Sequence, residues 1–202
     1  MNRLLCVTLT VVFLIGCSNR YVVAADQTVV FAGGCFWGIE AVFEHVRGVS
    51  DVRSGYTGGT KSTANYDDVS YGRTKHAEAV EIKLDPAVVS YEQLLKVFFT
   101  VAHDPTELNR QGPDVGPQYR SAIFFSSAEQ QKASTAFIAS LTSSKVFKKK
   151  IVTRVVPLNV FYPAEDYHQD FMKKNPDHEY IVAHDVPKVE ALKKQFPDLF
   201  RG

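Results

Sequence analysis

Cysteine is scarce in this chain of 202 residues: only Cys6, Cys17 and Cys35 are present, and none follows Cys35. So few thiols exclude a scaffold held together by several disulfides. An excess of charge is also missing, because 23 basic and 22 acidic side chains give a net charge of +1. Without a basic stripe, nucleic-acid binding has no support.

Internal repeats, low-complexity tracts and linkers rich in proline or glycine are absent after Asp26. The chain is 45% hydrophobic and 12% aromatic, which is enough to bury a core of its own. These features predict a single domain over residues 26–202.

The most apolar run lies at the N-terminus, where Leu4–Gly16 follows the positive charge of Arg3. It is too short for a comfortable membrane span and is typical of an export signal. The run ends in Leu-Ile-Gly-Cys, which resembles a lipobox and would make Cys17 a lipid-modified N-terminus. Cleavage after Ala25 is the alternative. We therefore predict an export segment over residues 1–25 and a periplasmic or cell-envelope location.

Export leaves Cys35 as the single cysteine of the domain, within the stretch Gly-Gly-Cys-Phe-Trp-Gly. A strand pattern before it and apolar residues at helical spacing after it place Cys35 near a helix N-terminus. Free N–H groups and the helix dipole favour an anion there, so we expect a lowered pKa for the thiol. The alternative is an inert core residue. Phe36 and Trp37 are adjacent and cannot share one core face, so at least one ring should line a hollow beside the thiol.

The rest of the chain alternates between strand and helix patterns. Strands are expected over 27–34, 49–59, 76–86, 121–126 and 151–158, and helices from Cys35, over 91–103, after Ser127, over 164–175 and briefly after Pro187. Ser90 with Gln93, and Ser127 with Gln130, match capping boxes. A long polar loop covers 103–121. We therefore predict an α+β fold, a compact single domain with a mixed β-sheet, packed helices and long loops.

Three histidines invite a metal centre or a Cys–His hydrolase as an interpretation: His76, His103 and His168. None of them has the close spacing of a ligand pair, and one cysteine is too few for a thiolate metal site. We interpret all three as hydrogen-bonded structural or surface residues.

Six short motifs occur in a fixed order along the chain: GGCFWG, GYTGG from Gly55, NYDDV from Asn65, HAEAV from His76, HDPT from His103 and GPQYRS from Gly116. This set spans about Val29 to Lys174 and resembles the type A peptide methionine sulfoxide reductases. The resemblance implies a ferredoxin-like core with active-site loops. It also implies an enzyme that reduces the S epimer of methionine sulfoxide, free or in proteins.

The same resemblance assigns roles to individual residues. Cys35 matches the nucleophile, which attacks the sulfoxide sulfur and becomes a sulfenic acid as methionine is released. Glu78 matches the acid that protonates the departing oxygen, and its apolar neighbours should raise its pKa. Tyr66 and Tyr119 match two hydrogen-bond donors to that oxygen, and Asp114 matches a supporting acid in the loop before Tyr119.

Phe36 and Trp37 match the ring wall around the S-methyl group of the substrate. Many family members regenerate their nucleophile through further cysteines near the C-terminus, but this chain has none there. An external thiol must then reduce the sulfenic acid: thioredoxin, glutaredoxin, glutathione or a similar donor. No bound cofactor or metal is implied.

The expected partners are oxidised proteins or peptides, the thiol donor and, through a lipidated Cys17, the membrane. We otherwise expect a monomer. Two further interpretations stay open: another cysteine-based enzyme, a peroxidase or hydrolase, and a non-catalytic module that binds methionine-rich segments.

Overall fold

The computed structural model describes residues 27–202, and the predicted export segment with Cys6 and Cys17 lies outside the described residues. The strands are β1 (Gln27–Ala32), β2 (Val49–Thr57), β3 (Ala77–Leu84), β4 (Arg110–Gln111), β5 (Asp114–Val115), β6 (Ala122–Phe125), β7 (Arg154–Pro157) and β8 (Phe161–Pro163). The α-helices are α1 (Phe36–Glu44), α2 (Tyr66–Ser70), α3 (Tyr91–Val97), α4 (Ala128–Ser143), α5 (Phe171–Lys174) and α6 (Val186–Gln195). Short 3₁₀ turns cover Lys61–Thr63, Pro117–Tyr119 and Asp166–His168, and π-helical turns cover Phe98–Ala102 and Ile181–Asp185.

The central sheet has the strand order β7-β6-β1-β3-β2-β8. Its middle is built by the succession β1–α1–β2–β3–α3–β6, in which β3 inserts between β1 and β2 and β6 joins the far side of β1. This is the ferredoxin-like split βαβ arrangement. Because β7 pairs parallel to β6 while the other neighbours are antiparallel, the sheet is mixed. The predicted α+β class is confirmed.

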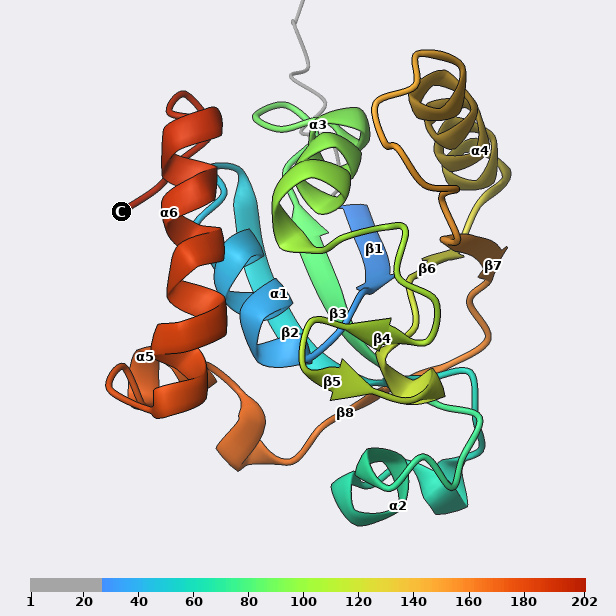
Figure 1. Ribbon diagram of the computed structural model, residues 1–202, viewed down its shortest axis with the longest axis vertical. Coiled ribbons are helices and arrows are strands. Elements are labelled where there is room, and N and C mark those ends of the chain that lie inside the picture. Colours follow the sequence, from blue (N-terminus) through green and yellow to red (C-terminus); the bar gives the residue numbers. More distant parts are fainter. Residues whose placement is uncertain (1–26) are drawn as a thin grey trace, which may run out of the picture.

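The two faces of the sheet bury different clusters. On one face Val29, Phe31 and Ile82 pack against helices α1, α3 and α6, which lie together in front of the sheet in Figure 1. On the other face Val30 and Phe124 belong to a smaller cluster. Neighbouring residues of β1 thus alternate between the clusters, as the two-residue period of a strand requires.

Helix starts follow the local sequence closely. Ser90 accepts a hydrogen bond from the Gln93 N–H, and the Gln93 side chain accepts one from the Ser90 N–H, so this predicted capping box is complete. At the start of α4, Ser127 accepts from the Gln130 N–H, but the Gln130 side chain accepts from Ser126 instead. That box is only half formed.

The C-terminal part of the chain departs from the prediction. A continuous helix over 164–175 was expected, but Asp170 has a positive φ of 51° and interrupts it before α5. A left-handed residue cannot continue a right-handed helix. The brief turn expected after Pro187 is instead the ten-residue helix α6. Within residues 27–202 no helix combines the length and apolarity that a membrane crossing requires.

Candidate active site

Cys35 is the N-cap of α1, at the turn that leads out of β1, as the sequence pattern predicted. Gly34 makes this turn with a φ of +105°, a conformation that side chains rarely allow. Gly33 lies so close to His103 that a Cβ on it would come within 2.8 Å of the imidazole Cγ. Gly34 therefore permits the sharp turn, and Gly33 permits its close packing against His103. Together they position the thiol at the helix start.

The protonation state of Cys35 differs from the prediction. Its side chain is buried, and this burial, followed by the negative charges of Glu78 and Asp185, raises the pKa of the thiol well above its ordinary value. The Trp37 N–H at the helix start acts in the opposite direction, but it is the weaker influence. The expected lowering of the thiol pKa was wrong, because desolvation outweighs the helix N-terminus.

Glu78 lies at the same helix start, although it comes from the adjacent strand β3. Glu78 is 2% exposed, and its carboxyl group accepts a hydrogen bond of 3.1 Å from the Phe36 N–H. Burial raises the pKa of Glu78 to about 8, and the charge of Asp114 adds to the rise. The direction is the one expected from its apolar neighbours, so the carboxyl group is mostly protonated at neutral pH.

The two rings that follow Cys35 have different environments. Phe36 is 1% exposed and belongs to the main core. Trp37 is half-buried and stacks on Phe171, with ring centroids 3.7 Å apart and planes at 5°. The Trp37 Nε1–H also donates to Nδ1 of His168 over 3.0 Å. Trp37 is thus the ring that remains partly open to solvent, and Phe36 supports it from the core.

The predicted oxygen-site residues lie around the thiol and Glu78. Tyr66 begins α2, and Tyr119 ends the 3₁₀ turn Pro117–Tyr119; both are half-buried. Burial, and then the charge of Glu78, raises the pKa of Tyr66 to about 12 and that of Tyr119 further still. Cys35 and Asp114 are near enough to influence both phenols. Both hydroxyl groups therefore stay protonated and can donate a hydrogen bond at neutral pH.

Asp114, in β5, accepts a short hydrogen bond from the Tyr180 hydroxyl group. The Tyr180 ring meets the Trp37 ring edge to face at 6.0 Å. Tyr180 was not predicted as a site residue, and neither was Phe171. The concentration of aromatic residues between 161 and 180 is the signal that could have pointed to them.

The three histidines singled out in the sequence are buried and hydrogen-bonded. His76 bonds to the backbone of Gly59 and Thr60, and His168 to Trp37. His103 bonds to the Phe98 carbonyl group and to Ser121, and burial lowers its pKa to about 4. Within residues 27–202 no three side chains of His, Cys, Asp or Glu gather as metal ligands would.

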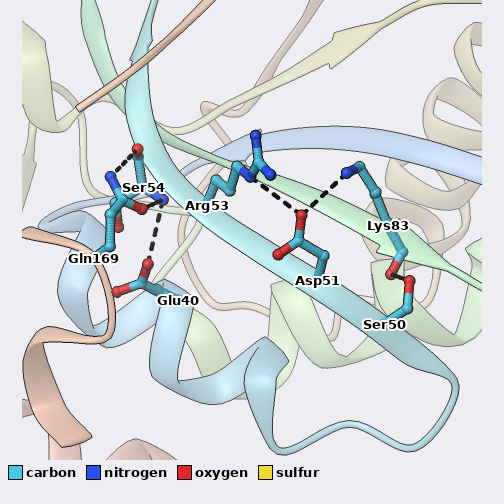
Figure 2. Close-up of polar contacts among 7 residues, drawn as sticks. All are labelled: Glu40, Ser50, Asp51, Arg53, Ser54, Lys83 and Gln169. Carbon is cyan, nitrogen blue, oxygen red and sulfur yellow. Dashed lines mark hydrogen bonds and ion pairs between the residues drawn. The ribbon is translucent and has the colours of Figure 1, made fainter. Parts of the chain in front are cut away.

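A cavity lies away from these residues. It measures about 860 Å³, is lined by the last part of α1, the first half of β2 and the segment around α5, and includes none of the predicted site residues. Figure 2 shows the polar contacts along this wall, where Asp51 pairs with Arg53 and Lys83. Glu40 and Gln169 both accept from the Ser54 N–H. The contact of Glu40 with Ser54 joins α1 to β2 and so helps to hold the helix that follows Cys35.

The amino-acid sequence of this chain matches a known protein family and several of its members. A family model described as peptide methionine sulfoxide reductase matches residues 27–199. The chain is 56% identical over 176 residues to peptide methionine sulfoxide reductase MsrA 2 of Synechocystis sp., covering 87% of this chain and 82% of that protein.

Solved structures agree with the sequence relatives. Mxr1 from Saccharomyces cerevisiae in reduced form is 34% identical, with a TM-score of 0.69 over 77% of this chain and 88% of that one. The structure of Mxr1 in complex with Trx2 has a TM-score of 0.50 at 24% identity, over 77% of this chain and 91% of that one. The family match includes every candidate site residue described above.

Proposed function

This chain belongs to the peptide methionine sulfoxide reductase family, and we propose that it reduces the S epimer of methionine sulfoxide through a sulfenic acid on Cys35. The observation that carries the proposal is the position of Cys35 and Glu78. The one cysteine among the described residues lies at the start of α1. The protonated carboxyl group of Glu78 lies at the same helix start, where it accepts from the Phe36 N–H. A thiol nucleophile and an acid are the two groups that sulfoxide reduction requires.

In the proposed reaction the Cys35 sulfur bonds to the substrate sulfur while Glu78 donates its proton to the sulfoxide oxygen. The S–O bond of the substrate and the bond between the two sulfurs then break, a bond forms between the hydroxyl oxygen and the Cys35 sulfur, and methionine leaves. The thiol proton replaces the one that Glu78 has donated. In total a thiol and a sulfoxide become a sulfenic acid and a thioether, so Cys35 loses the two electrons that the methionine sulfur gains.

Tyr66 and Tyr119 would donate hydrogen bonds to the oxygen as negative charge develops on it. Their raised pKa values support this role, because a protonated phenol is a donor. Asp114 would orient the site through its bond to Tyr180. Trp37, supported by Phe36 and stacked on Phe171, offers an apolar wall for the S-methyl group.

Regeneration would use an external thiol. The first thiol attacks the sulfenic acid, forming a mixed disulfide with Cys35 and releasing water, and a second thiol displaces Cys35 in its reduced form. Cys35 has no cysteine partner among residues 27–202, which supports an external donor. The yeast relative Mxr1 is described in complex with Trx2, so a thioredoxin-type protein is the first candidate; glutaredoxin and glutathione are the others.

We also propose that the protein works outside the cytoplasm as a monomer on oxidised proteins and peptides, and that Cys17 carries a lipid anchor. The apolar run and lipobox-like end of residues 1–17 support the anchor. The intact mass of the exported protein tests it. An N-terminal diacylated Cys17 is the expected result, and an unmodified Asp26 would overturn it.

The deciding experiment for the activity is stereospecific. Peptides with S- or R-methionine sulfoxide are incubated with the purified protein and excess dithiothreitol, and the methionine formed is counted. We expect turnover of the S epimer by the wild type and none by Cys35→Ser. Reduction of the R epimer alone, or activity in Cys35→Ser, would refute the proposal. Turnover of peroxide or esters that does not depend on Glu78 would favour the other cysteine enzymes instead.

A further inference from the structure

A buried ion pair from the C-terminal helix lies against the first turn of α1. Asp185 ends the π-helical turn before α6, and its Oδ1 is 3.1 Å from Nζ of Lys188. The Asp185 side chain is 0% exposed and that of Lys188 is 20% exposed. Although Asp185 is the N-cap of α6, its side chain makes no capping hydrogen bond there.

The contact with α1 is made at Gly38, three residues after Cys35. A Cβ built on Gly38 would overlap Oδ1 of Asp185 and come within 2.6 Å of Nζ of Lys188. Glycine inside a helix is unfavourable relative to alanine, so its presence here needs a reason. The missing side chain leaves the space in which the two charged groups approach the helix that carries the thiol.

Stability does not account for this pair. Oδ2 of Asp185 is buried and has no hydrogen-bond partner among residues 27–202. An unsatisfied buried oxygen is unfavourable, and a buried ion pair contributes little to folding compared with apolar side chains of the same size. An ion pair with this unfavourable feature, lying against the helix that carries the thiol, points to a role in the chemistry beside it.

The charges of the pair act on Cys35 in opposite directions. The negative charge of Asp185 raises the pKa of the thiol, and the positive charge of Lys188 lowers it by a smaller amount. The titratable groups that face the thiol come from several elements: Glu78, Asp185, Lys188, Tyr66, Tyr119 and Tyr180. Of these, Asp185 ends the π-helical turn Ile181–Asp185, Tyr180 directly precedes that turn, and Lys188 lies in α6.

We propose that Asp185, held in place by Lys188, is a positioning residue whose buried negative charge outweighs the Lys188 charge and helps to hold the resting Cys35 in its protonated, weakly nucleophilic form. The inference rests on the proposed role of Cys35 as the nucleophile. The pair keeps the thiol from reacting with adventitious electrophiles, and reactivity is reserved for a sulfoxide bound beside Glu78.

Alkylation of Cys35 by iodoacetamide tests this directly, since the thiolate is the reacting form. The rate is measured from pH 6 to pH 10 by the mass of the peptide that contains Cys35. Asp185→Asn removes the negative charge and leaves that of Lys188, so at pH 7.5 it should react at least about threefold faster than the wild type. The double variant Asp185→Asn/Lys188→Met has neither charge and should react at an intermediate rate.

The predicted order of alkylation rates, with the single variant fastest, the double variant intermediate and the wild type slowest, separates an electrostatic role from a structural one. A loosened helix contact would make the double variant at least as reactive as the single variant, and that result would overturn the proposal. Equal rates in the wild type and both variants would also overturn it. If Asp185→Asn does not fold, the double variant, which lacks the buried charges, must still react faster than the wild type. Lys194→Met, an exposed lysine of the same helix, is the control and should leave the rate unchanged.

Alkylation does not depend on sulfoxide turnover, so the two proposals can fail separately. If the alkylation order holds while no methionine sulfoxide is reduced, the proposed function fails and the influence of the pair on the thiol stands. If sulfoxide turnover is normal but the alkylation rates do not follow the predicted order, only the positioning role of Asp185 and Lys188 is refuted.

Discussion

Replacing Glu78 with glutamine should raise the stability of the protein at high pH while reducing its activity. The glutamine side chain has nearly the same shape as that of Glu78 and can still accept from the Phe36 N–H, so the packing is preserved. It cannot ionise and cannot act as an acid. The variant therefore removes one property, the titration of a buried carboxyl group.

The sign of the stability effect follows from the raised pKa. Between the pKa of Glu78 in the unfolded chain and its value of about 8 in the folded protein, the folded state holds a proton that the unfolded state has lost. Stability must then fall as pH rises through this window and become constant above it. The contribution of Glu78 is most favourable at low pH, and the glutamine variant lacks this dependence.

The magnitude can be worked out from the same values. With about 4.3 for the unfolded chain and about 1.4 kcal/mol per pKa unit, a folded pKa of about 8 corresponds to about 5 kcal/mol at pH 9. About 1 kcal/mol of this is already lost at pH 5. The free energy of unfolding of Glu78→Gln, relative to the wild type, should thus increase by about 4 kcal/mol from pH 5 to pH 9.

Urea denaturation of both proteins at pH 5 and pH 9 measures this difference. Glu81→Gln, a part-exposed position on the same strand, is the matched control and should show no comparable change. The single-turnover rate of sulfoxide reduction should fall about 10² to 10⁴-fold in Glu78→Gln. The wild-type rate should decline above about pH 8 as Glu78 ionises, and the rate of the variant should not. If the stability difference between variant and wild type is the same at both pH values, Glu78 is ionised in the folded protein and the reasoning is refuted.

Three further substitutions test the surroundings of the site. Tyr180→Phe removes the hydrogen bond to Asp114 and should lower the free energy of unfolding in urea by about 1.5 to 3 kcal/mol; no loss would mean that water replaces the phenol. Gly33→Ala places a methyl group against the ring of His103 and should cost about 1 to 3 kcal/mol in the same assay, whereas an unchanged midpoint would show that the ring can move aside. Ser90→Ala removes a helix cap and should cost about 1 kcal/mol without changing the single-turnover rate, and a slower rate would contradict a purely local effect.

Local sequence predicted the backbone around the thiol well. The strand before Gly33, the turn and the helix that begins after Cys35 all follow from neighbouring residues, because turn chemistry and helix periodicity are short-range properties. The start of α3 at Ser90 is of the same kind. The failure at Asp170 is different, since nothing in the 164–175 pattern indicates a left-handed residue there.

The chemistry of the site depended on long-range contacts. The sequence pattern predicted that at least one of the rings of Phe36 and Trp37 lines a hollow, but only the fold shows that Phe36 is buried in the core while Trp37 stacks on Phe171, far along the chain. The aromatic residues between 161 and 180 could have pointed to Tyr180, but its pairing with Asp114 could not be predicted, because the two residues are 66 positions apart. Such contacts are decided by how the C-terminal segment packs on α1.

By itself, the sequence determined that one cysteine would stand at a glycine turn before a helix, without a later cysteine to pair with it. Only the tertiary structure decided its protonation. Desolvation depends on every atom that surrounds a group, and the groups around Cys35 come from β3, the Asp185 turn and α6. The local helix start favours a thiolate. The assembled fold favours a thiol, because burial destabilises the charged form more than the helix N-terminus stabilises it.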